Sequence, residues 1–296
     1  MTVRPFLLCF DDELAPAQRI AQAAGLELAV VERHRFPDGE LKLRLPSALK
    51  GPVALLRSLD HPNEKLVELL LVAQTARSLG ATQLTLIAPY LAYMRQDMAF
   101  RPGEAVSQTI VGRFLASLFD AVITVDPHLH RVATLEQAVP VTQAIVVSGA
   151  PLLSDLIARH HRSPFLMGPD SESAQWVAQA AQRHGFDHAV CHKVRNGDKQ
   201  VAIALPDAPL RGRAVVLIDD VASTGRTVAE ATRLALQAGA TSVDVAVTHA
   251  LFAEDALDVI LQAGVRHVWS TDCIAHSSNA AAIAPALAQA LLALHP

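Results

Sequence analysis

One segment decides the fold of this chain: Val215-Val216-Leu217-Ile218-Asp219-Asp220-Val221-Ala222-Ser223-Thr224-Gly225-Arg226-Thr227. Four apolar residues precede two carboxylates, and a loop of hydroxyl residues with one glycine leads into a helix-compatible stretch from Val228. This order is typical of a buried strand that feeds a tight turn at the start of a helix. Strand–turn–helix units of this kind build parallel α/β sheets.

The same segment has the composition of a phosphate-binding loop beside a sugar. The N-terminus of the expected helix and the loop hydroxyls favour an anion, and Gly225 lets the backbone approach a ligand closely. We expect Asp219 and Asp220 to hold the vicinal hydroxyls of a sugar. The loop differs from the Walker loop, which needs Gly-Lys-Ser/Thr, and from the dinucleotide fingerprint with its three glycines. It therefore predicts a sugar-phosphate site.

Short apolar runs alternate with stretches of helical periodicity along the whole chain. In the first half we expect strands at 7–10, 26–31, 53–56, 84–88 and 121–125, and helices at 15–24, 64–79 and 107–118. In the second half we expect helices at 152–159, 173–184 and 228–238, and strands at 165–167, 188–192, 201–205, 215–218 and 243–247. This alternation predicts parallel sheets with both faces covered.

A short repeat suggests that the two halves are alike. Leu79-Gly80-Ala81-Thr82 and Ala238-Gly239-Ala240-Thr241 each end an expected helix and open an expected strand. Together with the matching order of elements, the repeat predicts two domains, 1–145 and 146–279. The Ala-rich tail at 280–296 is expected to form a final helix from about Pro285 and to pack back on the first domain.

Composition restricts the class of protein. With 296 residues, 51% of them hydrophobic, the chain is long enough to bury two cores. A net charge of −4, 4% aromatic residues and the lack of a basic run argue against a nucleic-acid partner. Three scattered cysteines suit neither a disulfide framework nor a zinc site. With neither a cleavable leader pattern nor a membrane-spanning run, we expect a soluble cytoplasmic protein with no membrane partner.

Polar and charged side chains follow five of the expected strands. Open parallel sheets bind ligands at these carboxyl ends. Solvated loops with incidental charge would explain any one of the five, but they explain all five together poorly. In chain order these segments are Arg95-Gln96-Asp97, Asp126-Pro127-His128, Gly168-Pro169-Asp170, Lys193-Val194-Arg195 and the loop at 219–227.

Taken in order, the motifs resemble the ribose-phosphate pyrophosphokinase family, the phosphoribosyl pyrophosphate synthetases, from about Arg35 to Phe252. The resemblance implies an α/β fold of two type I phosphoribosyltransferase-like domains, each with a mainly parallel sheet flanked by helices. Besides the strand-end segments above, it rests on Phe36-Pro37-Asp38-Gly39-Glu40, Asn63-Glu64-Lys65-Leu66-Val67-Glu68-Leu69-Leu70, Tyr93-Met94-Arg95-Gln96-Asp97, His192-Lys193-Val194-Arg195 and Thr248-His249-Ala250-Leu251-Phe252.

The resemblance implies an enzyme of nucleotide biosynthesis that moves the β,γ-diphosphoryl group of ATP to the C1 hydroxyl of ribose 5-phosphate. Phosphoribosyl pyrophosphate and AMP are the implied products. Mg²⁺ is the implied cofactor because it bridges phosphate oxygens and lowers repulsion, with His128 and Asp170 as metal candidates. Lys193 and Arg195 are the implied catalytic cations of a flap, and in an extended segment they point to one face.

The resemblance also implies how the two substrates are held. Arg95 and Gln96 would bind ATP together with Phe36, Asp38 and Glu40, whose loop reaches the adenine from a neighbouring subunit. A homo-oligomer, a dimer or higher, follows from that arrangement. For ribose 5-phosphate the implied residues are Asp219, Asp220, Ser223, Thr224, Gly225, Arg226 and Thr227.

The chain departs from the family pattern in two loops and in a short flap from Arg195 to Val201, which indicates a divergent branch. Ser223 replaces the third Asp of the sugar-phosphate loop, and Arg226 replaces its second Gly. The family's Asp-x-Gly-Gly loop reads Asp170-Ser171-Glu172-Ser173, which removes flexible glycines and adds an acid. These changes leave the contribution of both loops to metal and phosphate binding open.

Two alternatives therefore stay open. One is a phosphoribosyltransferase that consumes phosphoribosyl pyrophosphate, and the other is a catalytically weak paralogue that regulates a true synthetase. The segment Arg95-Gln96-Asp97 and the pair Lys193 and Arg195 favour ATP and count against the transferase. Ser223 and Glu172 favour the weak paralogue somewhat.

Overall fold

The computed structural model of the chain describes residues 5–196 and 200–295, and for residues 193–202 it describes no side chains. The chain divides into two compact units, which we describe separately. Unit 1 is Met1–Val147 with Ala284–Pro296, and unit 2 is Ser148–Ile283.

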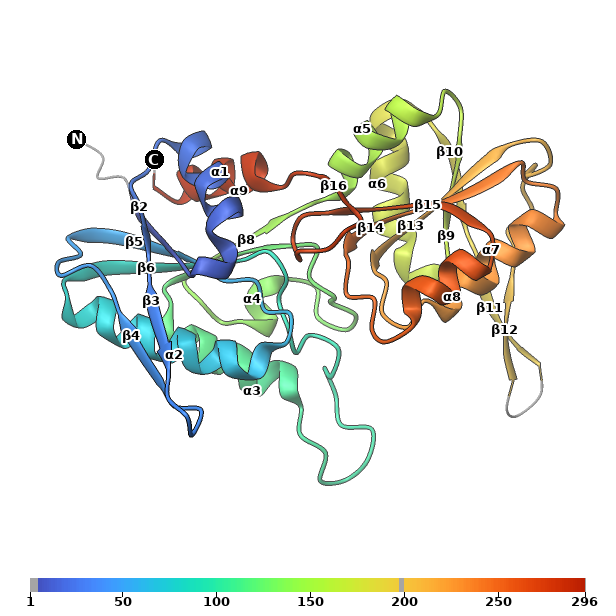
Figure 1. The fold of residues 1–296 in the computed structure, drawn as a ribbon. Helices are drawn as coiled ribbons and strands as arrows, with labels where there is room; N and C mark the ends of the chain where they lie inside the picture. Colours follow the sequence, from blue (N-terminus) through green and yellow to red (C-terminus); the bar gives the residue numbers. More distant parts are fainter. Residues whose placement is uncertain (1–4, 197–199, 296) are drawn as a thin grey trace. The chain divides into compact units, whose positions relative to one another are not determined.

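Unit 1 is built on a six-stranded parallel sheet in the order β2-β1-β5-β6-β7-β8. Helices α1 and α9 pack together on one face, and α2 and α3 cover the other (Figure 1). The strands are β1 Phe6–Cys9, β2 Leu28–Val30, β5 Gly51–Leu56, β6 Ala81–Ala88, β7 Ala121–Val125 and β8 Gln143–Val147. The helices are α1 Leu14–Ala24, α2 Pro62–Ser78, α3 Ser107–Leu118, α4 Leu135–Ala138 and α9 Ala284–Leu294.

Unit 2 has the same sheet topology, with parallel strands in the order β10-β9-β13-β14-β15-β16. One buried cluster joins α5 and α6 to the sheet, and another joins α7 and α8 to its opposite face. The strands are β9 Phe165–Gly168, β10 Asp187–Val190, β13 Ala214–Val221, β14 Ser242–His249, β15 Val265–Thr271 and β16 Asn279–Ala281. The helices are α5 Ala150–His160, α6 Ala174–His184, α7 Arg226–Gln237 and α8 Ala256–Gln262.

Each unit inserts an antiparallel hairpin at the same point of its topology (Figure 1). In unit 1, β3 Glu32–Arg35 pairs with β4 Leu41–Arg44, and in unit 2, β11 His192–Asn196 pairs with β12 Gln200–Ala204. Gly80 precedes β6 and Gly239 precedes β14, so the repeated Gly-Ala-Thr segments occupy equivalent places. The expected α/β fold with two similar halves is confirmed.

The structure differs from the sequence expectations at several elements. β13 continues through Val221, so Asp219 and Asp220 are part of the strand, and α7 starts at Arg226, two residues earlier than expected. The domain boundaries expected at 145 and 280 fall inside β8 and β16. The following elements were not expected: β3, β4, β8, β11, β15, β16, α4 and α8. The hairpin strands β3, β4 and β11 escaped notice because their charged residues interrupt the apolar run that is typical of a core strand.

Candidate functional site

Two adjacent carboxylates stand at the carboxyl end of β13, the third strand in its sheet. The preceding run 215–218 is completely buried, whereas Asp219 is half-buried and Asp220 is buried. Burial, and then the charge of Asp220, raise the pKa of Asp219 well above its usual range, and Asp170 adds to the shift. Neighbouring buried carboxyl groups with a raised pKa are typical of sites that bind a cation or hydrogen-bond donors.

The loop after β13 turns sharply into α7. Gly225 is the N-cap of this helix with φ 70°, in the left-handed region, and a Cβ there would meet the carbonyl oxygen of Ala256 at 2.8 Å. The glycine is therefore required by close packing against α8 as well as by its backbone angle. The first backbone N–H groups of α7 have no partner within the helix, which suits a phosphate.

The polar side chains of this loop stand beside that helix end. Ser223 and Thr227 are half-buried, and Thr224 and Arg226 are exposed. The carbonyl group of Ser223 accepts a hydrogen bond from the N–H of Ala253 at 3.0 Å, which ties the loop to the segment after β14. The seven residues expected to bind ribose 5-phosphate thus belong to one strand end, one turn and one helix start.

Asp170 follows β9, the neighbour of β13 in the sheet. Its carboxylate accepts the N–H of Glu172 at 3.0 Å and caps the 3₁₀ turn Ser171–Ser173, while its carbonyl group accepts the Ser173 hydroxyl at 2.6 Å. These bonds hold the side chain at the same sheet edge as Asp219. The substituted loop is therefore ordered by Ser173, without the two glycines of the family pattern.

In unit 1, His128 follows β7 in a loop that begins with an unusual backbone angle. Asp126 has φ 35°, a positive angle that residues other than glycine seldom adopt. His128 is half-buried and His130 is exposed, and their Nε2 atoms lie 2.5 Å apart with the rings nearly perpendicular. Sequence reasoning missed His130, although the His-x-His spacing was a usable signal.

Arg95 and Gln96 lie between β6 and α3. Arg95 is exposed, and Gln96 is half-buried. The carbonyl group of Gln96 accepts the N–H of Gln108 at the start of α3, at 3.1 Å. The side chain of Gln108 in turn donates to the Met94 carbonyl group at 3.1 Å. The segment is therefore pinned to α3 on both sides of Arg95.

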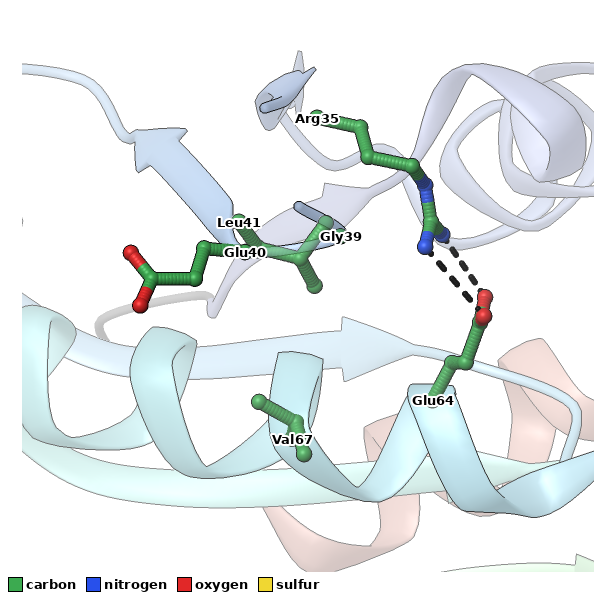
Figure 2. Close-up of a pocket in the computed structure, with 6 residues that line it drawn as sticks. All are labelled: Arg35, Gly39, Glu40, Leu41, Glu64 and Val67. Atoms are coloured by element: carbon green, nitrogen blue, oxygen red, sulfur yellow. Dashed lines mark hydrogen bonds and ion pairs between the residues drawn. The ribbon is translucent and has the colours of Figure 1, made fainter. Parts of the chain in front are cut away.

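Phe36, Asp38 and Glu40 form the exposed tip of the β3–β4 hairpin. The N–H of Phe36 donates to the Glu40 carbonyl group at 2.8 Å, and the Asp38 carboxylate accepts the N–H of Glu40 at 3.1 Å. Figure 2 shows a pocket beside the tip, between the hairpin and α2. Its lining residues are Arg35, Gly39, Glu40, Leu41, Glu64 and Val67.

Lys193 and Arg195 lie in β11, paired with Ile203 and Val201 of β12. The segment is thus an extended strand, and alternate residues of a strand point to the same face. The side chains of both residues lie outside the part of the chain that the structure describes.

The oxygen-rich sheet edge of unit 2 fits a hard divalent cation. Asp170, Asp219 and Asp220 offer carboxylate oxygens, the ligands that Mg²⁺ prefers, and burial together with the charge of Asp220 raises the pKa of Asp219. His128 and His130 offer nitrogen, which magnesium favours less. The acids of unit 2 are thus better suited to direct contact with magnesium than the imidazoles of unit 1.

Family comparisons divide the chain in the same way. Residues 7–118 match the N-terminal domain of ribose phosphate pyrophosphokinase, and residues 148–264 match the phosphoribosyl transferase domain. Within the described ranges, no helix combines the length and apolar character needed to cross a lipid bilayer.

Individual relatives match almost the entire chain. The ribose-phosphate pyrophosphokinase of Methanopyrus kandleri is 36% identical and covers 96% of this chain and 98% of its own length. Ribose-phosphate pyrophosphokinase 1 of Archaeoglobus fulgidus is 34% identical over 93% and 95%. The crystal structure of phosphoribosylpyrophosphate synthetase from Mycobacterium smegmatis has the same fold, with a TM-score of 0.86, 24% identity and 99% of both chains covered. The chain belongs to the ribose-phosphate pyrophosphokinase family.

Proposed function

We propose that this enzyme transfers the β,γ-diphosphoryl group of ATP to the C1 hydroxyl of ribose 5-phosphate and releases AMP. The observation that carries the proposal is the pair Asp219 and Asp220 beside the N-terminus of α7. Family membership supplies the reaction class, and this strand end supplies a place for both parts of a sugar phosphate. Unit 2 is the domain we assign to the sugar, and unit 1 the domain we assign to ATP.

The sugar-phosphate site works by position and charge. Asp219 and Asp220 accept hydrogen bonds from the ribose hydroxyls, which fixes the ring and places its C1 hydroxyl. The N–H groups at the start of α7, with the hydroxyls of Ser223, Thr224 and Thr227, bind the 5-phosphate. Arg226, exposed in the first turn, adds a cation on the phosphate side.

Magnesium, when bound, neutralises phosphate charge and polarises the transferred group. The carboxylates of Asp170 and Asp219 are suited to hold it beside the sugar. In unit 1, His128 is suited to contact a magnesium ion through water, or to contact a phosphate oxygen, because imidazole is an unusual direct ligand for magnesium.

The flap cations stabilise the charge that develops during transfer. Lys193 and Arg195 are two residues apart on β11, and in the proposed flap both act from one face of the hairpin. On closure they face the transferred diphosphoryl group and the departing AMP, and the flap excludes water. Arg95 and Gln96 hold the nucleotide from unit 1, and the tip with Phe36, Asp38 and Glu40 serves the adenine of a neighbouring copy.

Self-association is part of the proposal. An apolar groove on unit 1 lies between α2 and α3 and includes Leu70, Ile110 and Phe114. Ile110 is 59% exposed, and an apolar surface of this kind favours contact with a second chain. A cytoplasmic location agrees with the three buried free cysteines.

The test is AMP release from ATP in the presence of magnesium and ribose 5-phosphate. We expect Lys193→Ala to slow this reaction by two orders of magnitude or more, about 3 kcal/mol, since a cation that faces the transition state is lost. Lys50→Ala, which removes an exposed lysine before β5, is the matched control and should leave the rate unchanged.

Two results would overturn parts of the proposal. If the wild-type protein releases no AMP with any pentose phosphate, the proposed reaction is wrong, and a phosphoribosyltransferase and a regulatory paralogue are the alternatives left. If Lys193→Ala stays within about tenfold of wild type, roughly 1.4 kcal/mol, the assignment of the flap is wrong.

A further inference from the structure

The β3–β4 hairpin of unit 1 forms a separate two-stranded sheet beside α2. Its polar contacts to α2 follow a regular pattern. Arg33 and Arg35 are two residues apart on β3, and Glu64 and Glu68 are one turn apart on α2. These spacings put two cations on one face of a strand opposite two anions on one face of a helix.

The outer pair of this pattern is exposed. The guanidinium of Arg35 donates to both oxygens of Glu64 at 3.2 and 2.7 Å, as Figure 2 shows. Both side chains face solvent, where water weakens an ion pair. We therefore expect the outer pair to contribute little to the position of the hairpin.

The inner pair is buried on the helix side. Arg33 Nη1 donates to Glu68 Oε1 at 2.6 Å, and the side chain of Glu68 is only 1% exposed. Arg33 Nη2 donates to Asp11 at 2.9 Å, which connects the hairpin to the end of β1 as well. A charged contact shielded from water has a strongly preferred geometry, so this pair determines where β3 sits against α2.

A second arginine, Arg57, forms an ion pair with the other carboxylate oxygen of Glu68. Arg57, at the end of β5, is 1% exposed, and its Nη2 lies 2.5 Å from Glu68 Oε2. Its Nη1 donates to both oxygens of Asp12 at 2.9 Å, and its guanidinium lies 4.6 Å from the centre of the Phe10 ring. Arg57 and Glu68 thus form one rigid connection from the central sheet to the hairpin.

We propose that Arg57 and Glu68 are positioning residues for nucleotide binding. Through Arg33 they set the angle of the β3–β4 hairpin and so the place of the tip that carries Phe36, Asp38 and Glu40. The inference rests on the proposed function, which assigns that tip to ATP. According to this inference, Arg57 and Glu68 lie remote from the reacting atoms and control the affinity for the nucleotide. They do not affect the sugar site.

The decisive variant is Glu68→Gln, which keeps the side-chain shape and removes the charge shared by the two arginines. We expect the KM for ATP to rise by about tenfold, because a loosely held loop loses binding geometry. The kcat at saturating ATP and the KM for ribose 5-phosphate should stay unchanged. A purely structural role predicts no such split, because lost folded protein lowers the apparent kcat alone.

Three further variants sharpen the test. Arg33→Gln, on the half-buried side of the contact, should reproduce the rise in KM for ATP if Glu68→Gln folds poorly. Glu64→Gln breaks the exposed outer pair and should have a smaller effect. Glu32→Gln removes the exposed partner of Arg44 on the same hairpin and should have none. Equal effects of all four substitutions, or an unchanged KM for ATP in Glu68→Gln and Arg33→Gln, would overturn the inference.

A binding measurement separates this inference from the proposed reaction. Calorimetry with magnesium and a non-hydrolysable ATP analogue should show the same tenfold weakening in Glu68→Gln and none in Glu32→Gln. If wild type binds the analogue but releases no AMP, the reaction is wrong and the binding ratio still decides the role of Glu68. If wild type does not bind the analogue at all, both proposals fail.

Discussion

Arg57 in unit 1 and Asp219 in unit 2 occupy equivalent places in two sheets of identical strand order, and they carry opposite charges. Val53 of β5 pairs with the fourth residue after Gly80, and Val215 of β13 pairs with the fourth residue after Gly239. Arg57 and Asp219 each come four residues after those valines, at the carboxyl end of the strand. The two halves therefore use one backbone position for different purposes.

The two units differ in what surrounds the carboxylates at this sheet edge. In unit 1, Asp12 and Glu13 after β1 receive hydrogen bonds from Arg57, so the sheet edge supplies its own cation. In unit 2, the equivalent strand end carries Asp219, whose pKa is raised by burial and by the charge of Asp220. The acids of one edge are paired with a cation of the protein, whereas at the other edge burial and the charge of Asp220 raise the pKa of Asp219. This contrast supports our proposal that unit 2 binds the sugar phosphate at a strand end that unit 1 uses for a structural connection.

Removal of the internal cation should have the largest effect on folding. Arg57→Met leaves Asp12, Glu13 and Glu68 without their shared partner, and we expect a loss of about 3–5 kcal/mol in the free energy of unfolding. Urea denaturation at neutral pH measures this change. Arg44→Met, in an exposed pair with Glu32, is the control and should stay within about 0.5 kcal/mol. Equal values for the two variants would show that Arg57 does not neutralise the acids.

The opposite result is expected at position 219. Asp219→Asn relieves repulsion with Asp220 while its amide oxygen still accepts the N–H of Asp220, so stability should stay equal or rise. The rate of AMP release should fall by about 100-fold, roughly 2.7 kcal/mol, as a contact to the sugar is lost. Parallel urea denaturation and steady-state assays give both numbers. A large loss of stability with little loss of rate would reverse our interpretation of the two edges.

The sequence predicts the central sheets well and the connections between them poorly. Apolar runs such as Val215–Ile218 identify core strands because both faces of a parallel sheet are covered. The β3–β4 hairpin escaped notice because its strand Glu32–Arg35 is almost entirely charged and is stabilised by α2. A local pattern contains no information about such a distant partner.

The same limit applies to the candidate sites. The acids at 219 and 220 and the turn that follows them are contiguous, so their position at a strand end was predictable from order alone. Arg57 and Asp12 are 45 residues apart, and spacing gave no sign that they pair. The ligands that we assign to Asp219, Asp220 and the turn after them stay predictions. The structure gives the surroundings of these residues, and experiments with substrates test their roles.

A pH titration tests the buried acid Glu13 at the sheet edge of unit 1, and the expected effect is smaller. Burial raises the pKa of Glu13 from its ordinary value of 4.5 to about 7, despite the nearby Arg57 guanidinium, the N–H of Ser58 and the Lys65 ammonium group. As pH rises from 4.5 to 7, Glu13 loses its proton in the unfolded chain but keeps it in the folded protein. The contribution of Glu13 to stability therefore falls across that window. Its ionisation costs at most about 3 kcal/mol above pH 7 and nothing below pH 4.

Glu13→Gln should therefore be as stable as wild type at pH 4 and more stable at pH 8, by on the order of 1–3 kcal/mol. The amide oxygen still accepts the N–H of Ser58, a bond of 2.6 Å in the wild type. Thermal unfolding at a series of pH values measures the difference. If the stability difference between Glu13→Gln and wild type is the same at all pH values, it arises from packing and not from the ionisation of Glu13.

The smallest expected difference concerns the paired glycines that precede β6 and β14. Gly80 and Gly239 have φ 104° and 93°, so alanine is strained at either position, by about 1–3 kcal/mol. A Cβ on Gly80 would meet the backbone carbonyl oxygen of Leu49 at 3.0 Å, whereas a Cβ on Gly239 would meet the flexible side chain of Arg211 at 3.3 Å. Because backbone yields less than a side chain, Gly80→Ala should unfold at lower urea concentration than Gly239→Ala. Equal urea midpoints for the two variants would mean that the backbone angle alone determines the cost of alanine at both positions. The two halves would then tolerate a Cβ equally well where their sequences repeat.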